Sequence, residues 1–167
     1  QGVSSAASDV YKRQLYNNSL DEYVVRHREA ALTLAATRST ATRFYVGRKP
    51  GASKDRGLAG EAELVAMLSR HGFETVYFED LSPREQAGIA NRAEVLVSAH
   101  GAGFANMLYA RPGSHFIELS HLQTARHRLG DFNMHAAASG AHHLHFFVDH
   151  DYDGDDDAVP DLSLIHI

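Results

Sequence analysis

The feature that most constrains the fold is a nearly continuous apolar run, Val95-Leu96-Val97-Ser98-Ala99, followed at once by His100-Gly101-Ala102-Gly103. A run without polar alternation is typical of a strand covered on both faces, as in the parallel sheets of α/β proteins. Glycines after such a strand let backbone N–H groups approach an anion, and the following helix N-terminus adds unpaired donors and a positive dipole end. The segment therefore predicts a strand, a phosphate cradle and a helix. A Gly-x-Gly pair alone fits a ligand-free tight turn equally well, so the flanking sequence must decide.

Strand-like and helix-like segments alternate along the rest of the chain. The apolar patterns predict strands over Arg43–Gly47, Thr75–Phe78, Val95–Ala99, Phe116–Leu119 and His145–Val148. Helical periodicity predicts helices over Leu20–Ala36, Glu61–Arg70, Pro83–Arg92, Phe104–Ala110 and Leu122–Ala136. Ser82, Pro83 and Glu85 form a full helix-start signal, with a capping serine, a proline at the first helical position and a glutamate placed to close a capping box. This alternation predicts a Rossmann-like α/β fold, with a mostly parallel sheet and helices on both faces.

The length and the two ends of the chain set the expected domain organisation. With 167 residues, 44% of them hydrophobic, the chain can build one compact core. Residues 1–14 and 162–167 resemble adapter-derived segments at the edges of metagenomic reading frames, and they lack the periodicity of the sequence between them. We therefore expect a non-native segment at 1–14, one Rossmann-like lobe at 15–150, and an acidic tail with an adapter-like end at 151–167.

Composition excludes several classes of protein. The formal net charge is −5, but seven aspartates lie between Asp149 and Asp161, so the remaining body carries a charge near +2. No basic stripe typical of nucleic-acid binders is present in the sequence, whereas a slightly cationic body suits a small anionic ligand. Absence of cysteine excludes disulfides and thiolate sites. The sequence contains neither an apolar run long enough for a membrane span nor a signal-peptide pattern, and the expected compartment is the cytoplasm.

The segment from Phe44 to Leu119 resembles the C-terminal, donor-binding lobe of the family 61 glycosyltransferases, a group that includes bacterial capsular-polysaccharide enzymes. The resemblance rests on four features: Arg56 with Glu61 downstream, His71-Gly72-Phe73-Glu74 before a strand, Glu85-Gln86, and the run HGAGFANMLYARPGSHFIEL from His100 to Leu119. One position departs from the family pattern, because Gly60 stands where an asparagine usually precedes the glutamate.

The resemblance implies a GT-B architecture of two facing lobes, of which this chain would supply one. It implies inverting transfer from a nucleotide-sugar, with a UDP-sugar as the expected donor, to a glycan acceptor, without a cofactor. The facing N-terminal lobe of the same parent chain would be the structural partner. A lobe of this kind alone would bind the donor without being an active enzyme.

The resemblance also implies roles for individual residues, and their chemistry agrees with those roles. Arg48 and Arg56 would approach the donor diphosphate, to which guanidinium groups bind bidentately. His100, the expected catalytic residue, would hydrogen-bond a phosphate or carry a proton, and Gly101, Ala102 and Gly103 would line the cradle. Glu118 would accept hydrogen bonds from the ribose, as acidic residues do in dinucleotide folds. Asn106 would lie beside the donor and bond loop backbone.

Two alternative functions remain open. A non-catalytic nucleotide-binding module would need the same cradle. A metal-dependent transferase would use Asp149 and Asp151, and this acidic segment also opens like an EF-hand loop but has Pro160 where a glutamate is needed. Metal binding by His142-His143-x-His145 is disfavoured because neighbouring strand residues point to opposite faces and no second ligand cluster follows. We therefore expect no metal site.

Overall fold

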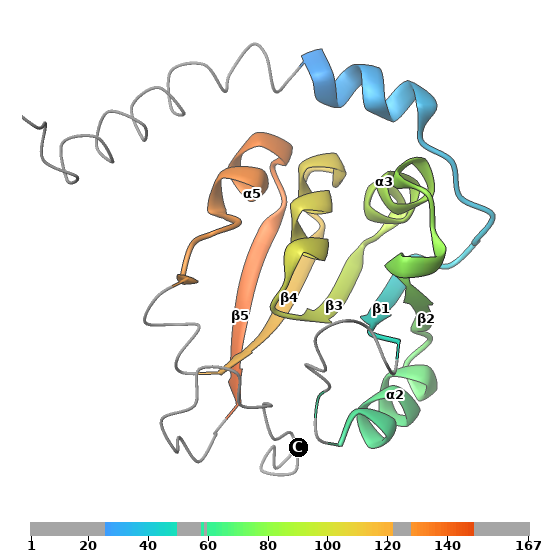
Figure 1. The fold of residues 1–167 in the computed structure, drawn as a ribbon, viewed down its shortest axis with the longest axis vertical. Helices are drawn as coiled ribbons and strands as arrows, with labels where there is room; N and C mark the ends of the chain where they lie inside the picture. Colours follow the sequence, from blue (N-terminus) through green and yellow to red (C-terminus); the bar gives the residue numbers. More distant parts are fainter. Residues whose placement is uncertain (1–25, 50–57, 59, 122–127, 149–167) are drawn as a thin grey trace, which may run out of the picture.

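The fold is a five-stranded sheet in which every strand pairing is parallel. The computed structural model describes residues 26–49, 58, 60–121 and 128–148. The strands are β1 (Arg43–Gly47), β2 (Glu74–Tyr77), β3 (Val95–Ala99), β4 (His115–His121) and β5 (His142–Val148), in the order β2-β1-β3-β4-β5. The predicted α/β, Rossmann-like fold is confirmed (Figure 1).

Helices cover both faces of the sheet, as predicted (Figure 1). The helical elements are α2 (Glu61–Arg70), η1 (Phe78–Asp80), α3 (Pro83–Arg92), η2 (Ala102–Tyr109) and α5 (Asn133–Ser139), and residues 26–34 are also helical. On one face, α3, η2 and α5 pack over Phe44 of β1, Leu96 of β3 and Phe116 of β4. On the other face, α2 packs over Tyr45 of β1 and Val97 of β3. Alternate side chains of β1 and β3 thus pack into two separate cores, which explains why both strands have continuous apolar sequences.

Several element boundaries agree with the sequence predictions because local signals set them. At the start of α3, Ser82 Oγ accepts from the backbone N–H of Glu85, whose carboxylate accepts from the N–H of Ser82 in return. This is the predicted capping box. At the end of α2, Gly72 takes a φ of 78°, in the left-handed region that favours glycine.

Three predictions about the elements need correction. The helix predicted over Leu122–Ala136 is not continuous: Gly130 has a φ of 101°, residues 129–132 form turns, and α5 begins at Asn133. The helix predicted over Phe104–Ala110 is the tighter 3-10 helix η2 and begins earlier, at Ala102. Strands β4 and β5 extend beyond their predicted apolar runs, because the register between them continues through polar residues such as His142. Residues 20–25 and 122–127 of the predicted helices lie outside the described residues.

Candidate functional site

Strands β1 and β3 end side by side, at the position where an open parallel sheet binds ligands. Strands β1 and β3 are neighbours, and Val46 pairs with Ser98 near their carboxyl ends. The chain leaves β1 toward α2 on one face of the sheet and leaves β3 toward η2 on the other. The point where successive connections diverge in this way is where doubly wound sheets hold their ligands. Arg48 and His100 are the first residues after these two strands.

Arg48 extends from the end of β1 across the loop that follows β3. Its Nη2 donates a hydrogen bond to the backbone carbonyl oxygen of His100 at 3.2 Å. The guanidinium lies so close to Gly101 that a Cβ atom at that position would stand 2.3 Å from Nη2. The backbone of Gly101 is extended, with a φ of 167°, a conformation that any residue can adopt. Glycine is needed at this position because the Arg48 guanidinium leaves no space for a Cβ atom. The structure thus brings together three of the predicted site residues, Arg48, His100 and Gly101.

The first turn of η2 is anchored at both ends and exposed between them. The backbone N–H of His100 donates to the carbonyl of Leu119 at 3.0 Å, and the side chain of Phe104 is buried in the core. Ala102 and Gly103, which lie between these anchors, are exposed. Because the first N–H groups of a helix have no partner within it, this turn can present donors to an anion beside Arg48.

A buried carboxylate holds the imidazole of His100. The His100 Nδ1 atom lies 2.6 Å from Oε1 of Glu118, whose side chain is completely buried in β4. An ionised carboxylate only accepts hydrogen bonds, so Nδ1 carries the proton and donates it. Nε2 of His100 has no hydrogen-bond partner among the described residues. Glu118 therefore fixes the ring and leaves its second nitrogen available to a ligand.

Two residues of β4 and β5 share in stabilising the Glu118 carboxylate. Ser120 Oγ donates to Oε1 at 2.8 Å, and Nε2 of His143 lies 2.8 Å from Oε2. Burial alone would raise the pKa of Glu118, but the hydrogen bonds from His100, His143 and Ser120 outweigh it and hold this pKa well below its ordinary value. The carboxylate is therefore ionised at neutral pH.

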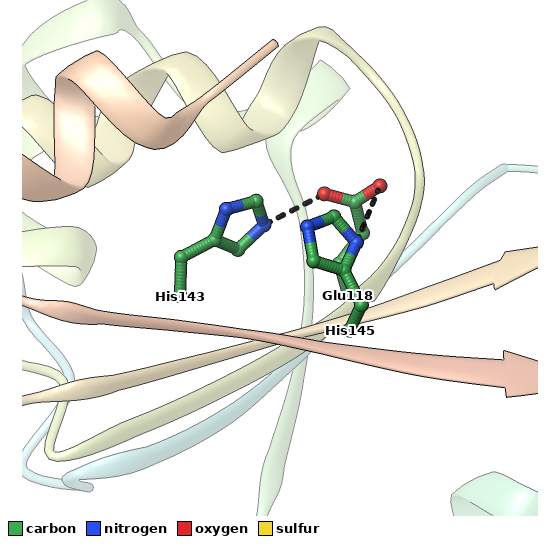
Figure 2. A group of neighbouring side chains, drawn as sticks. All are labelled: Glu118, His143 and His145. Carbon is green, nitrogen blue, oxygen red and sulfur yellow. Dashed lines mark hydrogen bonds and ion pairs between the residues drawn. The ribbon is translucent and has the colours of Figure 1, made fainter. Parts of the chain in front are cut away.

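The imidazole of His145 also faces this carboxylate, as Figure 2 shows for the two β5 histidines. Its Nδ1 is 3.8 Å from Oε1 of Glu118, too far for a hydrogen bond. Burial is the main cause of a lowered pKa for His145, so this ring is neutral at neutral pH.

A sequence profile of the family Glycosyltransferase 61 matches residues 8–117, more than half of the chain. The chain belongs to glycosyltransferase family 61. The match includes Arg48, the cradle from His100 to Gly103 and the start of β4, which are the segments that meet at the strand ends. Membership makes this a glycosyltransferase domain, and the family resemblance inferred from the sequence is confirmed. Among curated proteins, none matches the chain.

The departure of this family 61 chain from the usual pattern at Gly60 has a structural counterpart. Gly60 precedes α2 with a φ of 76°, a left-handed conformation that glycine adopts freely and asparagine tolerates better than most residues. The next residue, Glu61, accepts a hydrogen bond from the hydroxyl of Tyr45 at 2.7 Å. Burial and this bond raise the pKa of Tyr45 above its ordinary value. Glu61 thus ties the start of α2 to β1.

Asn106 is hydrogen-bonded to the loop after β3 and to a side chain of α3. Its Nδ2 donates to the backbone carbonyl of Gly103 at 3.2 Å and to Oε1 of Gln86 at 3.1 Å. Gln86 in turn donates to two carbonyls that precede α3, those of Phe78 and Leu81. The expected backbone contact of Asn106 is confirmed, and contact with a donor stays a prediction.

The remaining site predictions have different outcomes. Both oxygens of Glu118 are bonded within the protein, so the structure gives this residue a role in positioning His100, while contact with ribose stays a prediction. Arg56, Asp149 and Asp151 lie outside the described residues. No helix in the described ranges is both long and apolar enough to cross a membrane.

The expectation that strand geometry separates the three histidines of β5 is wrong for two of them. His142 does face away from its neighbour, but His143 and His145 are two residues apart and share one face of β5. Their missing partner is Glu118 on the adjacent strand, where it pairs in register with His145. Spacing by two residues was a usable sequence signal for the shared face, whereas the cross-strand partner required the register of the sheet.

Proposed function

We propose that this chain forms the donor-binding lobe of an inverting glycosyltransferase that transfers a sugar from a UDP-sugar to a glycan acceptor. The observation that carries the proposal is the Arg48 guanidinium lying across Gly101, where β1 and β3 end side by side. A cation beside exposed helix-terminal N–H groups suits a diphosphate. In the two-lobe architecture proposed here, the facing lobe holds the acceptor.

The transfer step places negative charge where this cradle can stabilise it. The acceptor hydroxyl oxygen attacks the anomeric carbon of the sugar, and the bond from that carbon to the diphosphate oxygen breaks. The electron pair of the broken bond goes to the leaving nucleoside diphosphate. Arg48 and the N–H groups of Ala102 and Gly103 supply preorganised positive charge for that leaving group. We propose that these groups take the place of a metal ion on the diphosphate.

His100 contributes through the ring nitrogen that Glu118 leaves available. The ionised Glu118 holds the Nδ1 proton and stabilises positive charge on the imidazole. A proton on Nε2 would then be donated to a phosphate oxygen as the bond to the sugar breaks. A base outside the described residues removes the proton of the acceptor hydroxyl.

Calorimetric titration with UDP tests the proposal. We expect saturable binding to the wild-type chain and a loss of about 10- to 150-fold in affinity for Arg48→Ala, because hydrogen bonds to charged groups contribute about 1.5–3 kcal/mol. Lys49→Ala is the matched control, since Lys49 is the adjacent cation and is exposed in a surface ion pair with Asp80. Absence of UDP binding, or equal affinity of wild type and Arg48→Ala, would contradict the proposed site.

Transfer assays on the complete reading frame separate the alternatives. UDP binding without sugar transfer would identify a non-catalytic nucleotide-binding module. Loss of transfer in an Asp149→Ala, Asp151→Ala double variant that still binds UDP would favour a metal-dependent enzyme. The proposal predicts transfer by wild type, unchanged transfer by the double variant and loss of transfer by His100→Ala.

A further inference from the structure

We propose that Glu118, His143 and His145 form a binding site for a transition-metal ion of the Zn²⁺ class. Each side chain offers one ligand atom, and the three atoms lie within 4.8 Å of one another (Figure 2). The site goes beyond the proposed transferase activity, because that proposal uses only Glu118, as the partner that positions His100, and gives His143 and His145 no part in the transfer.

The sheet itself sets the positions of the three ligands. Glu118 and His145 are register partners on the parallel strands β4 and β5, and His143 lies one pleat earlier on the same face of β5. The side chains of Glu118 and His143 are 0% and 4% exposed, and that of His145 is 15% exposed. Buried ligands on two hydrogen-bonded strands lose little freedom when an ion binds, which favours binding.

A buried nitrogen of His145 that lacks a hydrogen bond and faces Glu118 indicates a ligand. Nδ1 of His145 is buried and has no partner among the described residues. Burying a polar atom without a partner is unfavourable, and each such atom needs an explanation. It lies 3.8 Å from the carboxylate, close to the separation of about 3.4 Å expected for two atoms bound tetrahedrally to one zinc ion. An ion between them would give this nitrogen a partner.

The ligand chemistry selects the class of metal. Two imidazoles and one carboxylate form a ligand set that proteins use for Zn²⁺ and related transition metals, whereas Mg²⁺ and Ca²⁺ prefer oxygen ligands alone. Binding would break the hydrogen bond between Nε2 of His143 and Oε2 of Glu118, and as the ion takes Nε2 the proton of that nitrogen moves to Nδ1 or is released to water. His100 can keep its hydrogen bond to the carboxylate, as outer partners of metal ligands do. The ion would link β4 to β5 through Glu118, the residue that also holds the His100 ring.

Cobalt titration of the metal-free full chain tests this site, because Co²⁺ in a tetrahedral site gives visible absorption. We expect one tight equivalent, displaced by Zn²⁺ and unaffected by excess Mg²⁺. In His143→Asn and His145→Asn, affinity should fall by at least about 10- to 100-fold, the loss that even outer partners of a metal site cause. His142→Asn is the matched control, because His142 lies on the same strand but contacts the ring of His115 on the opposite face.

Two further measurements keep the proposal falsifiable if a variant fails to fold. Zn²⁺ at about 100 times its Kd should raise the Tm of wild type and His142→Asn by about 5–11 °C. In wild type, the imidazole ¹⁵N resonances of His143 Nε2 and His145 Nδ1 should shift with one equivalent of Zn²⁺. Binding that survives both β5 variants, absence of the tight equivalent, or unshifted resonances at these two nitrogens would overturn the site.

Discussion

Replacing Gly101 with alanine should remove Arg48 from the cradle while leaving the fold intact. The new Cβ would stand 2.3 Å from Nη2 of Arg48, which is far inside van der Waals contact. The clash falls on the end of a flexible side chain, and the backbone of Gly101 is extended, so alanine fits once the guanidinium moves. Losing the charge-assisted contact of Arg48 with the diphosphate should cost about 1.5–3 kcal/mol. We therefore expect the Kd for UDP to rise about 10- to 150-fold.

Lys49→Ala supplies the matched control for this experiment. Lys49 is the cation next to Arg48, but its side chain forms an exposed ion pair with Asp80. Calorimetric titration with UDP should give near wild-type affinity for Lys49→Ala and weak binding for Gly101→Ala, with similar melting temperatures for both. The reasoning is refuted if Gly101→Ala binds UDP as wild type does, or if both variants lose affinity equally.

Three further predictions concern stability. The pKa of Glu118 is lower in the folded chain than in the unfolded one, so its carboxylate stabilises the fold above a pH of about 4.3 and this stabilisation is lost as the pH falls below that value. In urea unfolding, the free energy of unfolding of Glu118→Gln should therefore decrease less steeply with falling pH than that of wild type. Equal pH dependence of the two proteins would contradict this. Ser82→Ala removes the cap of α3 and should cost about 0.5–2 kcal/mol in urea unfolding, whereas an unchanged midpoint would mean that the capping box contributes nothing. Gly88→Ala would set a Cβ 2.1 Å from the backbone oxygen of Ala36 and should destabilise by about 1–3 kcal/mol, and a wild-type melting temperature would rule out that contact.

The parts of the fold that could be predicted are those with local signals. Strands β1 and β3 are buried on both faces, so their sequences are continuously apolar and their bounds agree with prediction. The capping box begins α3, and Gly72 follows the end of α2. Each of these signals lies within a few residues of the boundary that it sets.

The parts that could not be predicted depend on distant partners. His142 belongs to β5 because it pairs with His115 of β4, although its side chain is exposed and polar. Gly130 breaks the predicted helix by taking a positive φ, which a glycine in a helical pattern permits but does not require.

The candidate site shows the same division. Arg48 and His100 could be placed together from the sequence because each directly follows an apolar strand, and parallel strands end at one edge. The contact between His100 and Glu118 could not be predicted, because it depends on how deeply the Glu118 side chain is buried in the folded sheet. His143 and His145 reach that carboxylate through the register of β5 on β4, which no local pattern encodes.

Amide ¹H–¹⁵N shifts during a UDP titration test the central claim most directly, because they report where the diphosphate binds. The account predicts saturable shifts at Gly101, Ala102 and Gly103 and at Arg48, with smaller changes at the opposite ends of the strands. Saturable shifts confined to other parts of the sheet, with this loop and Arg48 unchanged, would contradict it.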